Sequence, residues 1–332
     1  MSIDRHRHTL NGATIGTRWS ATFYATAATD LAAVRDALAQ VVDRVDAQMS
    51  TWQPASDLMR FNAAPTDTWI ALPAELLQVL DRGLAIGRAS GGAFDVGLGD
   101  LVAAWGFGAA GDTPDADAIR RTRQVARSPA HATLELDLGA GRARKRAPCT
   151  LDLSGIAKGF AVDEMTRTLG IFGIGSALVA LDGEVRACGM RPDGAPWVVA
   201  VEKPDHEVRS AWGTLALHDA AAATSGDYRH WLDVGGARLG HTMERARGGP
   251  VANGVASVTV VAATCTDADA WATALLVLGP EAGAPLARAH GLDALFLCRR
   301  GDQIVEFAVG ERFASRSPVP IRVGSATRAG SA

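Results

Sequence analysis

Apolar side chains recur at helical spacing in two long segments of the chain. Across residues 30–49 they fall three or four positions apart, which places them on one face of a helix. Residues 73–89 repeat the pattern, with proline in the first turn and a glycine pair at 91–92 just after the end. We predict an amphipathic helix in each segment, a shorter helical start at 56–60 and a polar helix within 112–128.

Strand-like patterns fill much of the remaining chain. Residues 17–25 mix β-branched and aromatic side chains, as a strand does. Residues 133–138 alternate apolar and polar side chains, turn at the glycines of 139–141 and return through a basic stretch to 150–153, which predicts a hairpin. Other strand-rich segments are expected at 177–217, 257–263 and 294–309, the last as a hairpin about 301–302.

Two further helices are expected at 155–169 and 267–278. Helices and strands alternate without a strict β-α-β rhythm, so we expect an α+β fold, with mixed sheets and flanking helices, rather than a doubly wound sheet. Residues 1–314 are expected to form a single domain, which has room for two lobes. Residues 315–332 are rich in Ser, Pro, Arg and Gly, and we expect a flexible tail there.

Composition narrows the class of protein without naming a function. The 332 residues are 48% hydrophobic and 21% charged, with a net charge of −3, so neither a nucleic-acid partner nor stable membrane insertion is expected. The four cysteines are scattered and are interpreted as buried free thiols. The first residues lack the apolar run of a signal peptide and a lipid-bearing cysteine, so we expect a cytoplasmic protein, or a periplasmic one if the native chain begins upstream.

Three segments combine glycine with side chains that suit ligand binding. At residues 90–95, two glycines allow close backbone approach and Phe94 offers a flat face, although a helix-ending glycine with a core aromatic would look the same. At residues 151–159, a strand leads into a helix start that favours anions and carries Lys158; a surface lysine is the alternative. His241 lies in a polar, glycine-rich stretch, which suits a catalytic histidine.

A possible metal site lies on the predicted helix 267–278. Asp269 and Thr273 are four residues apart, so on a helix they share one face. Carboxylate and hydroxyl oxygens suit Mg²⁺. Thr266 with Asp269 also fits a capping box, which needs no metal. Spacing alone favours the cap, but the cap and a metal could use different carboxylate oxygens.

Taken together and in order, these segments resemble the ApbE family, the FAD:protein FMN transferases, from about Gly12 to Val309. The motifs that carry the resemblance are Met49-Ser50-Thr51, Gly91-Gly92-Ala93-Phe94-Asp95, Asp152-Leu153-Ser154-Gly155-Ile156-Ala157-Lys158-Gly159, Thr224-Ser225-Gly226-Asp227 with His241, and Asp267-Ala268-Asp269-Ala270-Trp271-Ala272-Thr273. The resemblance implies a T-fold-like α+β fold whose lobes would enclose an FAD cleft. It also implies FAD as the substrate and Mg²⁺ as the cofactor.

The resemblance assigns residues to two groups. The metal ligands would be the backbone carbonyl of Gly155 with Asp269 and Thr273. The residues that contact FAD would be Met49, Ala93, Phe94, Asp95, Asp152, Lys158, Thr224, Ser225, Gly226, Asp227, His241 and Thr242.

The implied reaction cleaves the FAD pyrophosphate, attaches FMN to a threonine or serine hydroxyl of an acceptor flavoprotein and releases AMP. The family's acceptor pattern is roughly Asp-x-x-Ser/Thr-Gly/Ser-Ala-Thr. Such phosphoryl transfer depends on charge neutralisation and positioning, which Mg²⁺, Lys158 and a helix N-terminus would provide. We expect His241 to be the base for the acceptor hydroxyl, because a metal-bound carboxylate such as Asp269 accepts protons poorly.

One loop departs from the family pattern. The family usually continues its histidine as His-x-x-Asp-Pro-x-Thr-Gly, whereas this chain has His241-Thr242-Met243-Glu244-Arg245-Ala246-Arg247-Gly248. The substitutions lie beside the expected base, so we expect them to affect recognition of the target protein. Two alternatives therefore stay open: an FAD pyrophosphatase that yields FMN and AMP, and an FAD-binding protein without catalysis.

Overall fold

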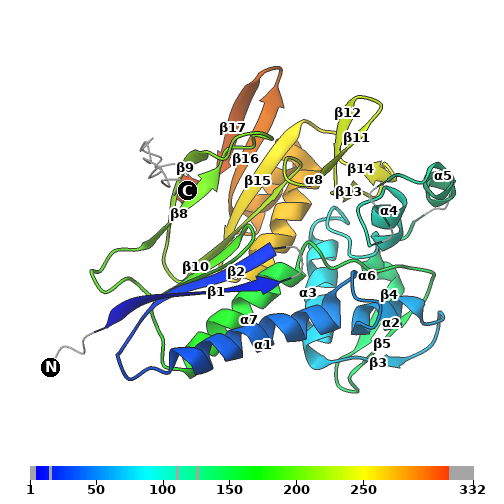
Figure 1. Ribbon diagram of the computed structural model, residues 1–332. Coiled ribbons are helices and arrows are strands. Elements are labelled where there is room, and N and C mark those ends of the chain that lie inside the picture. The colour runs from blue at the N-terminus through cyan, green and yellow to red at the C-terminus, as the bar shows by residue number, and fades with distance from the viewer. Residues whose placement is uncertain (1–4, 15–16, 110, 112, 125–126, 314–332) are drawn as a thin grey trace, which may run out of the picture.

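The computed structural model describes residues 5–313 except 15–16, 110, 112 and 125–126, so the expected tail at 315–332 lies outside the described residues (Figure 1). An eight-stranded sheet, antiparallel at every neighbouring pair, forms its centre. Across the sheet its strands are β1 (His6–Thr14), β2 (Thr17–Ala25), β6 (Ala177–Leu181), β7 (Glu184–Cys188), β10 (Ala220–Gly226), β15 (Val255–Ala262), β16 (Asp293–Arg300) and β17 (Gln303–Val309). The α+β class is confirmed; β1 and β10 were not predicted.

Both faces of the central sheet are covered. Helices α7 (Ala157–Ile171) and α8 (Cys265–Ala289) pack on one face, and α1 (Leu31–Met49) packs on α7 (Figure 1). The hairpin of β8 (Trp197–Glu202) and β9 (Ala211–Leu217) contributes to a second apolar cluster on the other face. On β16, Phe296 belongs to the helix-side core, while Leu295 and Leu297 belong to the β8–β9 side. This period of two explains why the central strands are apolar at nearly every position.

A group of helices and a small sheet lies beside the main sheet, to the right in Figure 1. Its helices are α2 (Asp57–Ala63), α3 (Ala74–Ala89), α4 (Gly99–Ala104), α5 (Ala116–Gln124) and α6 (Ala130–Thr133), and its strands pair in the order β3 (Ile70–Ala71), β5 (Arg142–Lys145), β4 (Leu134–Asp137). Two small hairpins join it: β11 (Trp231–Val234) with β12 (Ala237–Gly240), and β13 (Met243–Glu244) with β14 (Gly249–Pro250). One apolar core runs through this group and the main sheet. The single turn η1 (Glu311–Phe313) ends the described chain.

The predicted boundaries at residues 150–153 and 278 differ from the structure in informative ways. The predicted hairpin return is β5, which ends at Lys145, so residues 150–153 are not a strand. Instead the side chain of Asn62 replaces a strand partner there, because it accepts from the Leu151 amide at 2.7 Å and donates to the Leu151 carbonyl at 2.9 Å. The helix expected to end at residue 278 does break there, since Gly279 has φ 70°, but a second helical segment continues the element to Ala289.

Within the described ranges, no helix combines the length and the apolar character needed to cross a bilayer. All four cysteines are free, as expected; Cys265 and Cys298 are also buried as expected, whereas Cys149 and Cys188 are only half-buried.

Candidate functional site

In the first turn of α8, one residue caps the helix and a different residue, Asp269, carries a buried carboxylate. The cap is Thr264, whose hydroxyl accepts from the Asp267 amide at 3.2 Å. Asp269 is only 3% exposed, and its Oδ2 accepts from the backbone amide of Gly159 at 3.0 Å, in the first turn of α7. The predicted capping box of Thr266 with Asp269 is therefore wrong, because the cap lies two residues earlier in the chain. Asp269 is left free of that role.

Thr273 follows Asp269 by one turn on the same face of α8. Its hydroxyl lies 3.1 Å from the hydroxyl of Ser225, at the end of β10. Gly155 packs directly against it, since a Cβ at Gly155 would lie 2.9 Å from Thr273 Oγ1. The structure thus brings together the three predicted metal-ligand positions, and a side chain at residue 155 would crowd that meeting point.

Lys158 lies in the first turn of α7 and is held by two carboxylates. Its ammonium is 2.9 Å from Glu184 Oε1 and 3.3 Å from Asp182 Oδ2. The Glu184 side chain is 3% exposed, and its second oxygen has no hydrogen-bond partner among the described residues. Burial alone would lower the pKa of Lys158, but the charges of Glu184, Asp269 and Asp182 outweigh it and raise that pKa. Lys158 is therefore a permanent cation.

The carboxylates around Lys158 outnumber it. Burial and then the charge of Glu184 raise the pKa of Asp269 to about 8, although Lys158 opposes the shift. Burial also raises the pKa of Glu184. Three acidic side chains thus share one ammonium, and this environment would be stabilised by an additional cation.

The Gly91-Gly92 turn after α3 places the predicted ligand-binding segment, residues 90–95, beside the predicted metal-ligand positions. Both glycines have positive φ, 63° and 83°, which L-residues rarely adopt. The buried ring of Phe94 lies 3.3 Å from the position of a Cβ on Gly155, and Ala93 beside it is half-buried. Phe94 therefore packs next to the metal-ligand positions.

Asp95 points into the protein rather than toward solvent. Its side chain is 2% exposed, and Oδ1 accepts from the amides of Gly97 at 2.9 Å and Ala130 at 3.0 Å. Burial raises the pKa of this carboxyl despite these hydrogen bonds. Its other oxygen lies 3.6 Å from Arg245 Nε. Asp95 thus links the backbone that follows the turn to the start of α6.

The end of β10 is anchored by side chains of neighbouring strands. The hydroxyl of Thr224 lies 2.8 Å from that of Thr259 on β15, and Gly226 packs on the Tyr228 ring. Asp227 Oδ2 is 2.5 Å from Arg299 Nη1, while its Oδ1 is buried without a partner among the described residues. Of the predicted group at residues 224–227, Ser225 makes the direct link to α8 described above.

His241 lies directly after strand β12. Its Nδ1 lies 3.3 Å from the carbonyl of His230, which can only accept, so the proton is on Nδ1 and the lone pair is on Nε2. Burial, then the charge of His230, lowers the pKa of His241 to about 4. The charges of Lys158 and Asp152 also act on it. His241 is therefore a neutral imidazole with its acceptor lone pair on Nε2.

The remaining predicted residues lie at different depths. Asp152 is half-buried and accepts from the Ser154 amide at 2.8 Å. Thr242 is half-buried and its carbonyl accepts from the Val251 amide at 2.9 Å. Met49 ends α1 and is buried in the main apolar core, to which Phe94 also belongs.

The sequence reasoning missed Glu184 and Asp182, the two partners of Lys158. Both belong to the turn between β6 and β7, where Asp182 has φ 56°. The acidic turn Asp-Gly-Glu between two apolar strand runs is visible in the sequence. Its proximity to Lys158 is not, because the packing of α7 on β6 and β7 sets that contact.

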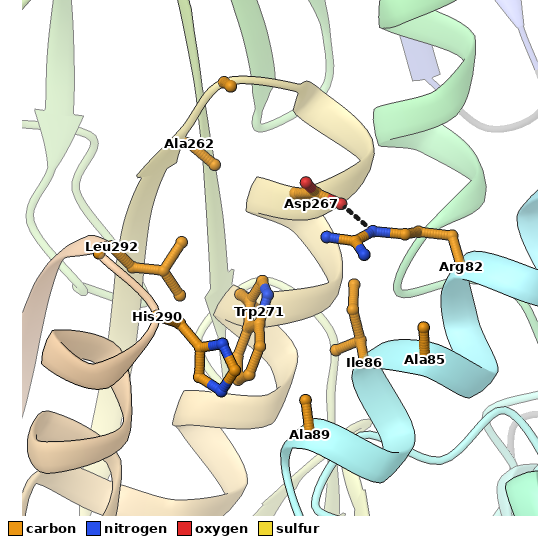
Figure 2. Close-up of a pocket in the computed structure, with 11 residues that line it drawn as sticks. Arg82, Ala85, Ile86, Ala89, Ala262, Asp267, Trp271, His290 and Leu292 are labelled. Atoms are coloured by element: carbon orange, nitrogen blue, oxygen red, sulfur yellow. Dashed lines mark hydrogen bonds and ion pairs between the residues drawn. The ribbon is translucent and has the colours of Figure 1, made fainter.

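A separate pocket of about 330 Å³ lies on the opposite face of α8, between α8 and α3 (Figure 2). Arg82 Nε and Asp267 Oδ1 are 2.5 Å apart on its wall, and the rings of Trp271 and His290 pack with centroids 4.7 Å apart. None of the residues that line it belongs to the predicted site. The concave space of Figure 2 and the predicted chemistry thus lie in different places.

Comparisons with known proteins agree with the resemblance seen in the sequence. The chain matches the ApbE family over residues 15–296. It is 33% identical to an FAD:protein FMN transferase of Vibrio cholerae, over 90% of each chain, and 31% identical to that of Escherichia coli K12, over 88% of this chain and 84% of the relative. Among solved structures, the flavin transferase ApbE from Vibrio cholerae superposes with a TM-score of 0.82 at 31% identity, covering 92% of this chain and 98% of the other. The apo form of Pseudomonas stutzeri flavinyl transferase ApbE gives 0.82 and 31%, covering 93% and 96%.

Proposed function

The chain belongs to the ApbE family, and we propose that it is an FAD:protein FMN transferase that depends on Mg²⁺. In the proposed reaction, a threonine or serine hydroxyl of an acceptor flavoprotein attacks the FMN phosphorus of FAD. A new O–P bond forms, the P–O bond to AMP breaks, and the hydroxyl loses its proton. The observation that carries the proposal is the junction of α7, α8 and β10, where Gly155, Asp269 and Thr273 meet beside Lys158.

The residues at this junction fit a magnesium ion. A carbonyl, a carboxylate and a hydroxyl are hard oxygen donors, which Mg²⁺ prefers. Asp269 accepts one hydrogen bond, at Oδ2, from the described residues, which leaves Oδ1 available. The acidic excess around Lys158 also favours a bound cation. Bound there, Mg²⁺ would supply charge neutralisation at the FAD pyrophosphate.

The side chains of the protein supply the other requirements of the transfer. Lys158, kept cationic by Glu184 and Asp182, provides positive charge for the pyrophosphate at the start of α7. His241 accepts the proton of the acceptor hydroxyl at Nε2, since its other ring nitrogen is fixed by the His230 carbonyl. Phe94 and the two preceding glycines form the side of the site that we assign to the flavin nucleotide.

The test is to incubate the protein with FAD, Mg²⁺ and an acceptor that carries the family's target pattern. Mass spectrometry of the acceptor and chromatography of the nucleotides separate the possible activities. FMN on the acceptor threonine supports transfer. AMP release without acceptor labelling identifies a pyrophosphatase, and tight FAD binding without either product identifies a binding protein. An acceptor whose target threonine is replaced by valine is the matched control, because it offers the same surface without the nucleophile.

A further inference from the structure

Asp163 lies on α7 and binds the start of α8. Its Oδ1 accepts from the backbone amide of Cys265 at 2.9 Å, and its Oδ2 accepts from the amide of Thr266 at 2.9 Å. The hydroxyl of Thr266 also donates to Oδ2, at 2.6 Å. The first amides of a helix have no partner within the helix, and a carboxylate suits the positive end of its dipole. Asp163 therefore satisfies the two amides that precede the Asp267 amide, which Thr264 caps.

The main sheet holds the Asp163 side chain in place. This side chain is 13% exposed, and Arg186 of β7 pairs with its Oδ1. Glu184, two residues before Arg186 and on the same face of β7, binds Lys158 of α7 at 2.9 Å. Two ion pairs thus join α7 to β7, one with its cation on the helix and one with its cation on the strand. The carboxylate that binds α8 is therefore fixed relative to the sheet.

Helices α7 and α8 touch directly at Gly159. A Cβ at this position would overlap the carbonyl oxygen of Cys265 and lie 2.9 Å from Cβ of Asp269, so a side chain there would force the helices apart. The amide of Gly159 donates to Asp269 Oδ2 at 3.0 Å. The two helices therefore bind each other reciprocally: Asp163 of α7 binds amides of α8, and Asp269 of α8 binds an amide of α7.

These contacts determine the orientation of the proposed metal ligands on α8. Asp269 lies three residues after Thr266, within one turn, so a shift of the helix start would move its carboxylate. Thr273 lies one turn further along and packs on Gly155. With Oδ2 engaged by the amide of Gly159, Oδ1 is the oxygen that Asp269 offers to a metal.

We propose that Asp163 is a positioning residue for the proposed magnesium site. It holds the start of α8 so that Asp269 meets the Gly159 amide and keeps one oxygen available as a ligand. Residues that orient metal ligands from outside commonly contribute about 10–100-fold to metal affinity. A purely structural cap would instead contribute to stability and leave the affinity for Mg²⁺ unchanged. The inference rests on the proposed function, because it concerns the metal on which that function depends.

The test compares two carboxylates that bind amides at helix starts. Asp163→Asn removes the charge and leaves only one acceptor atom. Asp30→Asn is the matched control, because Asp30 is exposed, accepts from the amides of Ala32 and Ala33 at 3.0 Å at the start of α1, and loses the same charge. Calorimetric titration with Mg²⁺, with FAD bound and no acceptor present, gives the dissociation constants. We expect binding about tenfold weaker in Asp163→Asn and, because an exposed charge is screened, changed by less than about twofold in Asp30→Asn.

Two further measurements separate position from charge. Thr266→Val removes the hydroxyl that donates to Asp163 and leaves the net charge unchanged, so it should weaken Mg²⁺ binding by about threefold. Amide hydrogen exchange at Gly159, followed by nuclear magnetic resonance on the metal-free protein, reports on the bond to Asp269. We expect this exchange to be at least about tenfold faster in Asp163→Asn than in the wild-type protein, and unchanged in Asp30→Asn.

The Mg²⁺ dependence of turnover provides a kinetic check. The Mg²⁺ concentration for half-maximal AMP release should follow the dissociation constants, while the rate at saturating Mg²⁺ stays within about twofold of the wild-type rate. Wild-type affinity for Mg²⁺ in Asp163→Asn would overturn the proposal. Weaker binding with unchanged Gly159 exchange would also overturn it, because the effect would then be one of charge alone. If Asp163→Asn does not fold, Thr266→Val decides: weaker binding supports the proposal and unchanged binding overturns it.

Failure of this inference is distinguishable from failure of the proposed function. A protein that labels an acceptor in an Mg²⁺-dependent way, but binds Mg²⁺ equally well in all variants, keeps the proposed function and loses the inference. A protein that binds Mg²⁺ more weakly in Asp163→Asn, with faster exchange at Gly159, yet labels no acceptor keeps the inference and loses the transferase assignment.

Discussion

The two faces of α8 carry the same kinds of side chain and differ in what surrounds them. On one face Asp269 is 3% exposed, meets a backbone amide, and lies among Glu184, Asp182 and Lys158. On the other, two residues earlier, the Asp267 side chain is 22% exposed and pairs with Arg82 on a pocket wall (Figure 2). The pocket has the more obvious concave shape, yet the buried charge lies on the other face. The proposed metal site thus coincides with an electrostatic imbalance and not with the pocket of Figure 2.

The largest expected effect separates the two aspartates. Asp269→Asn removes a proposed metal ligand and should lower Mg²⁺-dependent AMP release by at least about 100-fold, the scale of losing one strong transition-state contact. Asp267→Asn, its matched control on the pocket face, should change the rate by less than about threefold, because an exposed ion pair contributes about 0–1 kcal/mol. Magnesium titration by calorimetry should show weaker binding in the first variant alone. Equal rates in both variants would remove Asp269 from the metal site.

The next prediction compares two histidines. His241→Ala should slow FMN transfer by about 100-fold, at the lower end for general-base catalysis, while leaving the FAD dissociation constant within about twofold. His290→Ala, beside Trp271 in the pocket, should leave transfer unchanged. Single-turnover transfer and FAD fluorescence titration measure the two quantities. A rate in His241→Ala that matches the wild-type rate would mean that another group, or water, takes the proton.

A smaller difference is expected in the free energy of unfolding when the cation on each side is replaced. Lys158→Met leaves the buried Glu184 without its cation and should cost about 2–3 kcal/mol of unfolding free energy, below the full cost of breaking a buried pair because the ammonium is partly exposed. Arg82→Met leaves Asp267 in contact with solvent and should cost about 0–1 kcal/mol. Urea unfolding without nucleotide or metal gives both values. Equal costs would mean that the carboxylates around Lys158 are better solvated than the structure indicates.

The smallest expected effect is on pH dependence. A histidine of ordinary pKa would lose its base form as the pH falls below about 6.5. Because the pKa of His241 is lowered to about 4, its neutral form persists through that range. At saturating Mg²⁺ the transfer rate should therefore change by less than about twofold between about pH 8 and about pH 6. A tenfold decline over that interval would show that His241 is more solvated or is not the base.

Local pattern determined the long elements and the positions of the predicted motifs along them. The periodic apolar residues of α1 and α3 and the break before Pro280 in α8 follow from helical spacing and from glycine and proline, which act over a few residues. The four-residue spacing of Asp269 and Thr273 likewise fixed their shared face. The resemblance to a family then connected segments that spacing alone left separate.

Only the tertiary structure decided the environment of these residues. Asp269 meets the Gly159 amide across 110 positions of sequence, and the cap of α8 is Thr264 rather than the Thr266 that local spacing favoured. Packing of α7 on the sheet brings Glu184 beside Lys158, and the hairpin after His241 directs Arg245 inward and leaves Arg247 exposed. Burial and charge depend on every element packed around a group. The sequence by itself therefore determined which residues could bind or react, and the packing of distant segments decided which of them are buried, charged and within reach of one another.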